Sequence, residues 1–320
     1  MFRQAEALTK AKPTNSVSPV PTRTYHQKTL SVPNEFSFHE CLKFLARSEK
    51  EKMHVIKAER VRKLVKFDDG PVLFELSHPT KTAIQICFLN QPVSRAAIAA
   101  VSEYVNDWFD LETDLAPFYQ LTETDQLLKN LTTRYYGLRL IKIPDLFEAL
   151  CWAILGQQIN VAFAYTLKQR FVENFGESFT FDGEIYWLFP TPEVVAELQL
   201  ADLLRLQFNR QKAEYIIGLA RVMRNGEVSK QDLLELNSIV AAREALMKIR
   251  GVGPWTASYV LMRCLGFRSA FPIEDIGLHN ALQRQLNWTR KPTIAEIKSL
   301  SAGWNGWQAY ATFYLYRSLL

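Results

Sequence analysis

The chain has 320 residues, 48% of them hydrophobic and 22% charged, and its formal net charge is +5. This composition supplies packed cores and excludes a chain that is disordered throughout, and no apolar run reaches the roughly 20 residues of a membrane helix. The positive charge suits an acidic partner such as nucleic acid without proving one.

The N-terminal third is expected to hold a tail and a small sheet. Residues 1–34 contain four prolines and five basic residues but only one acid, which is typical of a flexible tail. A short helix is expected from Phe36 to about Ala46. Strand patterns follow at 53–58, 60–67, 71–77 and 82–89. We therefore expect an N-terminal α/β lobe over residues 35–120, built on an antiparallel sheet.

Helical periodicity dominates the rest of the chain, beginning with an amphipathic pattern at 94–111. Asp145 precedes a helix and has Glu148 three residues after it, which is a capping-box arrangement. A second helix is expected at 161–175, and Asn209 precedes a further one. Residues 121–320 should therefore form a helical body, and the expected fold class is α+β, mostly α.

The sequence MKIRGVGPWTASYVL, residues 247–261, describes two helices joined by a tight hairpin, a helix-hairpin-helix motif over about 240–265. Pro254 suits the first position of the second helix. Gly251 and Gly253 let another backbone or a phosphate come close, and the N–H groups at a helix start attract anions. The hairpin alone is equally typical of a phosphate site and of a plain turn.

A carboxylate follows the hairpin in FRSAFPIEDIGLHNAL, residues 267–282. Gly266 ends the preceding helix, and an extended stretch leads to Asp275 at the start of the next one. On frequency alone, such an aspartate is more often a simple N-cap than a catalytic group.

Residues 246–282 resemble the helix-hairpin-helix and Gly/Pro-Asp signature of the base-excision DNA glycosylase superfamily, and specifically that of bacterial DNA-3-methyladenine glycosylase II. The segment 143–171, with its Ile-x-Gly-Gln-Gln motif, resembles the same family. Further similar pieces follow in the same order, at 188–198, 206–220 and 303–318. The resemblance implies an enzyme with a small sheet-bearing lobe before a helical body.

By this resemblance Asp275 is the catalytic carboxylate, which stabilises an oxocarbenium-like sugar and orients or deprotonates water. Relatives that also cut the strand have a Schiff-base lysine at the position of Trp255, so a monofunctional enzyme that leaves an abasic site is implied. Trp255, Tyr259 and Trp307 match pocket residues, and electron-rich rings suit a flipped cationic base. Without the resemblance, three such rings would be more typical of core packing.

The resemblance also assigns DNA contacts. Gln158 occupies the place of a wedge that fills the gap left by a flipped base, although relatives have leucine there and a loop glutamine is often only solvated. Arg250, Gly251 and Gly253 are expected at the phosphate backbone. Arg210, Lys212 and Arg263 are further basic candidates that periodicity cannot separate from solvated side chains.

The implied partner is double-stranded DNA with alkylated bases, bound by a monomer in the bacterial cytoplasm, associated with the nucleoid through DNA and without a membrane. Four cysteines lie far apart without ligand spacing, so we expect reduced thiols, no metal site and no cofactor. Two alternatives stay open. One is a glycosylase of the same superfamily for oxidised or other damaged bases, and the other is a non-catalytic helix-hairpin-helix DNA-binding protein. A structural helical protein with a mildly basic surface is a third, less specific interpretation.

Overall fold

The computed structural model describes residues 25–90 and 92–320, so most of the expected tail, residues 1–24, lies outside the described residues. The later part of the expected tail is a strand instead: His26–Ser31 form β1 and pair with β5 (Ala83–Phe88). Five of its six residues are exposed, and Leu30 is partly buried, so the strand lacks the apolar alternation that reveals an element in a sequence.

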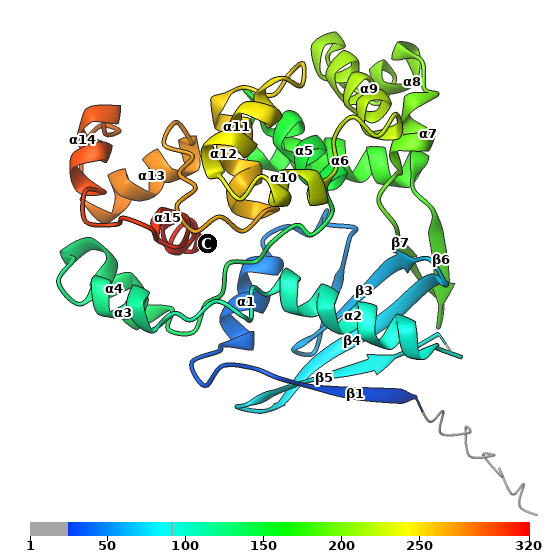
Figure 1. Ribbon diagram of the computed structural model, residues 1–320, viewed down its shortest axis with the longest axis horizontal. Coiled ribbons are helices and arrows are strands. Elements are labelled where there is room, and N and C mark those ends of the chain that lie inside the picture. Colours follow the sequence, from blue (N-terminus) through cyan, green and yellow to red (C-terminus); the bar gives the residue numbers. More distant parts are fainter. Residues whose placement is uncertain (1–24, 91) are drawn as a thin grey trace, which may run out of the picture.

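The N-terminal lobe contains an antiparallel five-stranded sheet in the order β1-β5-β4-β3-β2. The strands after β1 confirm the four expected patterns: β2 (Val55–Lys57), β3 (Arg60–Phe67), β4 (Gly70–Thr80) and β5. Helices α1 (Phe38–Leu45) and α2 (Arg95–Trp108) complete the lobe, and α2 packs on the sheet, with 6.4 Å between the ring centroids of Phe74 and Tyr104 (Figure 1).

A two-stranded hairpin, β6 (Ser178–Phe181) and β7 (Glu184–Trp187), interrupts the helical half and was not expected. Its turn residues Asp182 and Gly183 both have positive φ, as the two central residues of a tight hairpin require. Tyr186 packs with Leu64, Leu73 and Leu89 of the N-terminal lobe. The hairpin thus joins the helical half to the sheet (Figure 1).

The helical body follows, and the expected fold class is confirmed. Asp145 and Asn209 cap their helices as expected, by accepting the N–H groups of Glu148 and Lys212. The helices are α3 (Ala116–Thr122), α4 (Gln126–Arg134), α5 (Leu146–Gly156), α6 (Val161–Phe175), α7 (Pro192–Ala196), α8 (Leu200–Leu204), α9 (Arg210–Arg224), α10 (Lys230–Glu235), α11 (Ile239–Met247), α12 (Pro254–Arg263), α13 (Ile276–Gln285), α14 (Ile294–Leu300) and α15 (Gln308–Arg317).

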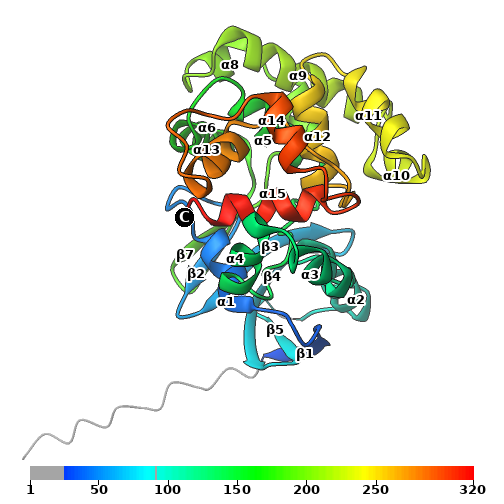
Figure 2. The same cartoon turned by 90° about the vertical axis from the view of Figure 1, so that its left-hand side faces the viewer.

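Helix α15 lies between the sheet-bearing lobe and most helices of the body, whereas α3 and α4 lie on the side of the lobe (Figure 2). Its Phe313 packs on Phe44 of α1, with ring centroids 4.3 Å apart. Within the described residues, none of the helices is both long and apolar enough to cross a membrane.

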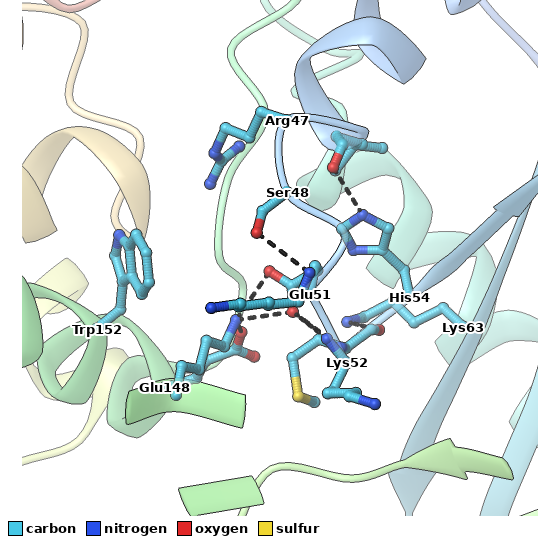
Figure 3. Close-up of polar contacts among 12 residues, drawn as sticks. Arg47, Ser48, Glu51, Lys52, His54, Lys63, Glu148 and Trp152 are labelled. Carbon is cyan, nitrogen blue, oxygen red and sulfur yellow. Dashed lines mark hydrogen bonds and ion pairs between the residues drawn. The ribbon is translucent and has the colours of Figure 1, made fainter. Parts of the chain in front are cut away.

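A buried cluster of charges closes the junction between the lobes (Figure 3). Lys168 of α6 donates to Glu148 of α5 at 2.9 Å and to Glu51 of the N-terminal lobe at 3.1 Å. The Glu148 carboxylate therefore binds Lys168 rather than closing the expected capping box. Burial alone would raise the pKa of Glu51, but the charge of Lys168, together with those of His54 and Arg47 and the Met53 N–H, outweighs burial and lowers it strongly. Glu51 also accepts the Met53 N–H, which fixes the turn before His54.

His54 in this cluster should make stability depend on pH. Burial is the largest cause that lowers its pKa from 6.5 to about 4, with Lys63 and Lys168 acting in the same direction and Glu51 opposing them. Because the folded pKa lies below the unfolded one, this contribution is complete above pH 6.5 and is lost as pH falls towards 4. The loss amounts to about 3 kcal/mol at most.

Denaturant unfolding of the wild type and of His54→Gln, at several pH values, measures this contribution. The difference in unfolding free energy between the two proteins should be constant above pH 6.5 and should shift against the wild type between pH 6.5 and 4. A difference that stays constant over the whole range would contradict the assignment.

Candidate active site

Asp275 is held between the start of one helix and a tryptophan of another. It is the N-cap of α13, where its Oδ1 accepts the Leu278 N–H at 3.0 Å, and its Oδ2 accepts the indole N–H of Trp255 at 2.8 Å. The residue is only 8% exposed, and within 25–90 and 92–320 it forms no ion pair. Its carboxylate is thus oriented by two fixed donors without a cation to neutralise it. The N-cap interpretation and the catalytic one are therefore compatible.

Trp255 and Tyr259 lie together on α12, with ring centroids 5.7 Å apart and planes inclined by 35°. The Tyr259 hydroxyl accepts from Trp152 at 2.9 Å and from Arg263 at 3.1 Å. Arg263 also donates to the Ile141 carbonyl and is 2% exposed, so it supports Tyr259 from inside and cannot contact DNA phosphates.

Trp307 has different neighbours. Its ring packs against Phe118 and Tyr310, and the Arg268 guanidinium lies 4.6 Å from its centroid. Within the described part of the chain it makes no ring contact with Trp255 or Tyr259. The structure thus brings two of the three expected pocket rings together and places the third in another aromatic group.

Tyr316 of α15 lies beside Asp275 and was missed by the sequence reasoning. A Cβ built on Gly277 would be 2.9 Å from Asp275 Oδ1 and 3.3 Å from Tyr316 Cε1, which places the ring next to the carboxylate. Burial and the negative charge of Asp275 raise the pKa of Tyr316 well above 10. Because α15 contains three tyrosines, spacing alone does not single this one out.

The hairpin between α11 and α12 borders an open groove of about 540 Å³. Gly251 has φ of +94°, and a Cβ there would lie 2.4 Å from the Tyr215 ring. Both the backbone conformation and the lack of space therefore require glycine. Gly253 has an ordinary φ of −91° and open space around it, and it caps α12 without a side chain. Arg250 is 77% exposed at its side chain and lies 3.2 Å from Glu214.

The loop after α5 forms the other wall of this groove. Gln158 lines the groove, is exposed and has φ of +57°, so the backbone leaves the helical conformation there. Gln157 donates to the Gly251 carbonyl at 2.9 Å and to Thr256 at 3.0 Å, which ties the loop to the hairpin and fits its expected structural role. Gly156 lies against Trp255, since a Cβ there would be 3.7 Å from the indole.

Lys212 supports this loop from below. Its ammonium donates to the carbonyls of Ile154, Leu155 and Gln157, at 3.0, 2.7 and 2.6 Å, and so satisfies the free carbonyls at the end of α5. Burial lowers the pKa of Lys212 to about 8. The expectation that Lys212 could contact phosphate is therefore wrong, because its donors are occupied inside the protein.

Within the described residues, no three His, Cys, Asp or Glu side chains are grouped so that they could hold a metal ion, and the four cysteines are free thiols. The geometry is thus one of an oriented carboxylate and aromatic rings next to a groove with a glycine hairpin.

Comparisons with known proteins place this geometry in a family. A model described as "HhH-GPD superfamily base excision DNA repair protein" matches residues 151–305, and one described as "8-oxoguanine DNA glycosylase, N-terminal domain" matches residues 24–150. The Bacillus subtilis (strain 168) protein named DNA-3-methyladenine glycosylase is 45% identical over 292 residues, which are 91% of this chain and 96% of that relative. The chain belongs to the HhH-GPD superfamily of base excision DNA repair proteins.

This HhH-GPD protein is a DNA glycosylase, and the resemblance inferred from its sequence is confirmed. Escherichia coli (strain K12) DNA-3-methyladenine glycosylase 2 is 29% identical over 56% of this chain and 60% of that relative. The solved 3-methyladenine DNA-glycosylase from Archaeoglobus fulgidus has a TM-score of 0.76 at 21% identity, covering 90% of this chain and 97% of its own. A Clostridium acetobutylicum 8-oxoguanine glycosylase/lyase, solved with double-stranded DNA, reaches 0.71 at 19%, covering 92% and 97%. These likenesses support the fold.

Proposed function

We propose that this HhH-GPD protein is a monofunctional glycosylase that flips alkylated, 3-methyladenine-type purines out of double-stranded DNA and hydrolyses the bond to the sugar. An abasic site remains. The observation that carries the proposal is the Asp275 carboxylate, oriented by the indole of Trp255 at 2.8 Å. The names of the Bacillus subtilis and Escherichia coli relatives support the substrate class.

In this proposal Asp275 supplies negative charge where the sugar becomes positive as the base departs. A preorganised charge in a site with little water acts strongly, because it need not reorient during the reaction. The same carboxylate can accept a proton from the attacking water. Trp255 and Tyr259 supply stacking faces for a base that is already cationic and therefore a good leaving group.

A monofunctional mechanism is supported by the absence of a suitably placed amine among the residues described around Asp275. Trp255 stands where strand-cutting relatives are expected to have lysine. Lys212 is 5% exposed and donates to three carbonyls. An amine must be free and close to the sugar to form a Schiff base.

Two assays test the mechanism together. Incubation with methylated DNA should release free alkylated purines and leave alkali-labile abasic sites, while borohydride should trap no covalent protein–DNA adduct. A strand-cutting glycosylase of known Schiff-base chemistry serves as the positive control for trapping. An adduct formed during base release would refute the monofunctional part of the proposal.

A second candidate function has specific support, because residues 24–150 match the 8-oxoguanine glycosylase N-terminal model. Duplexes that each carry one lesion, either 8-oxoguanine or an alkylated purine, separate the two candidates. Faster release of 8-oxoguanine than of every alkylated base would favour the second. A non-catalytic DNA-binding protein would release neither.

We further propose that the groove is the DNA-binding surface. Gly251, Gly253 and Arg250 would contact the phosphate backbone, and Gln158 would enter the gap left by the flipped nucleotide. The exposure of Arg250 and Gln158 supports these roles. The proposed acting species is a monomer, in the bacterial cytoplasm and associated with the nucleoid through DNA.

A further inference from the structure

Arg263 is a buried cation next to the rings of the candidate active site. It ends α12, one turn after Tyr259, and is only 2% exposed. Within the described residues it forms no ion pair. Its guanidinium donates to the Ile141 carbonyl at 2.7 Å and to the Tyr259 hydroxyl at 3.1 Å. A buried charge without a counter-ion is costly, and a neutral donor would satisfy the same carbonyl, so packing alone does not account for the charge.

The carboxylates close to Arg263 bind another cation. Glu51 and Glu148 border the same small cavity, of about 40 Å³, as Arg263. Both accept from the Lys168 ammonium, at 3.1 and 2.9 Å. Burial lowers the pKa of Arg263, and the charge of Arg47 acts in the same direction, but an arginine stays charged at neutral pH. The guanidinium charge is therefore present and is not paired with either carboxylate.

The hydroxyl of Tyr259 links this cation to the site. It accepts two hydrogen bonds, one from the Arg263 guanidinium and one from the Trp152 indole at 2.9 Å. A phenol oxygen that accepts two bonds can still donate one, and within 25–90 and 92–320 the Tyr259 hydroxyl donates to no acceptor. Its hydrogen is thus left for a ligand. A charged donor behind the hydroxyl makes it a stronger donor, because hydrogen bonds in a chain polarise one another.

Asp275 and Arg263 place opposite charges at the two ends of the aromatic pair of α12. Asp275 accepts from Trp255 at 2.8 Å, the rings of Trp255 and Tyr259 have centroids 5.7 Å apart, and Arg263 donates to Tyr259. When a glycosidic bond breaks, its electron pair moves onto the base, so the sugar becomes more positive and the base more negative. A carboxylate at one end and a guanidinium at the other match these two changes.

We propose that Arg263 is a positioning residue for base departure, which acts through the Tyr259 hydroxyl to favour the arrival of the electron pair on the leaving base. This inference rests on the proposed function of the site. The hydroxyl donates to a ring nitrogen or carbonyl oxygen of the flipped base and keeps its proton. A cationic purine leaves as a neutral base, and the sugar takes a hydroxyl group from water, whose other proton goes to Asp275.

The charge of Arg263 should act in opposite directions on binding and on the chemical step. An alkylated purine is cationic when it enters the site, so a nearby guanidinium opposes its binding. The repulsion disappears as the base becomes neutral. An interaction that is better in the transition state than in the ground state raises the rate of the step and not the affinity. A side chain that only supported the Tyr259 ring would help both.

A double-mutant cycle tests the route through Tyr259. Arg263→Gln removes the charge and retains a neutral donor for the Ile141 carbonyl. Single-turnover base release at saturating enzyme should fall about tenfold, since a charge that acts through a hydroxyl is weaker than a direct contact. In Tyr259→Phe, which lacks the hydroxyl, the same replacement should lower the rate by less than about twofold. Equal losses in the two backgrounds would overturn the proposal.

Arg221→Gln is the matched control. Arg221 of α9 also donates its Nε to a backbone carbonyl, that of Ala196 at 3.3 Å. This variant should leave the rate of base release unchanged. Affinity for an undamaged duplex and its dependence on salt should be the same in Arg263→Gln and the wild type, because a buried guanidinium contacts no phosphate. A weaker salt dependence in Arg263→Gln would show that Arg263 serves DNA binding, and would contradict the proposal.

Binding of an uncleavable lesion separates this inference from the proposed function. A duplex with 2′-fluoro-7-methylguanosine presents the cationic base on a sugar that resists cleavage. Relative to the same duplex with guanine, Arg263→Gln should bind it about threefold more tightly than the wild type does. If the wild type released no base but this difference held, the proposed function would fail and the role of the Arg263 charge would stand. Equal or weaker relative binding by the variant would overturn the inference, even if the wild type released alkylated purines.

Discussion

Replacing Asp275 by asparagine should lower the rate of base release by about 100-fold or more. The amide keeps the shape of the side chain, and its oxygen can still accept the N–H of Leu278 or of Trp255. What disappears is the negative charge against the developing positive sugar and the ability to take a proton from water. Single-turnover release of alkylated purines, with DNA binding measured in parallel, checks this expectation.

The chain offers a close control for this variant. Asp125 is the N-cap of α4, where one carboxylate oxygen accepts the N–H groups of Leu127 and Leu128 and the other accepts the Trp304 indole N–H at 2.7 Å. Asp125→Asn therefore makes the same chemical change in a similar set of donors, but at another helix. It should retain base release. Equal activity in the two variants would sink the catalytic assignment of Asp275 and favour a non-catalytic DNA-binding protein.

The second large effect is expected from Lys168→Met, which should destabilise the protein by about 3–5 kcal/mol. Lys168 is the cation between Glu51 and Glu148, and the side chains of all three are less than 10% exposed. Removing it leaves two buried carboxylates without their partner. Burial lowers the pKa of Lys168, but the charges of Glu148 and Glu51 outweigh burial and raise it, so the ammonium is present at neutral pH.

Denaturant unfolding at pH 7 measures this loss, and Lys66→Met is the matched control. Lys66 pairs with Glu177 at 2.7 Å, but both side chains are about half exposed, so breaking that pair should cost less than about 1 kcal/mol. The double variant Lys168→Met with Glu148→Gln should recover part of the loss, because only one carboxylate then remains unpaired. Similar losses in the two single variants would contradict the buried-pair argument.

The sequence predicted those parts of the fold in which local signals agree with each other. Strand alternation and helix caps located β2 to β5 and the starts of α5 and α9, because caps and apolar periodicity depend on neighbouring residues. The strand β1 has no such pattern and is stabilised by pairing with β5, more than 50 residues away. The β6–β7 hairpin carries only a short signal, Asp182-Gly183, which lies within a region of helical periodicity.

The candidate site shows the same limit at the level of single residues. Periodicity put Trp255 and Tyr259 on one face, and the structure places them in ring contact. Nothing local reveals that Trp255 donates to a carboxylate 20 positions later, or that Tyr316 lies beside it. Lys212 has the charge expected of a phosphate contact, yet its ammonium donates to carbonyls at the end of α5. Such roles depend on three-dimensional packing.

The course of α5 has a mechanical consequence. The helix has 11 residues, about 16 Å, and runs from the buried charges at the lobe junction to the loop of Gln157 and Gln158. If the loop acts as the proposed wedge, force applied to it by a base pair would pass along this stiff helix to Glu148 and Lys168, and from Lys168 to Glu51 of the N-terminal lobe. The loop is thus held in position by α5 and by the buried ion pairs at the start of that helix. In the proposed flipping step, distortion would then fall on the duplex, which can bend and unstack.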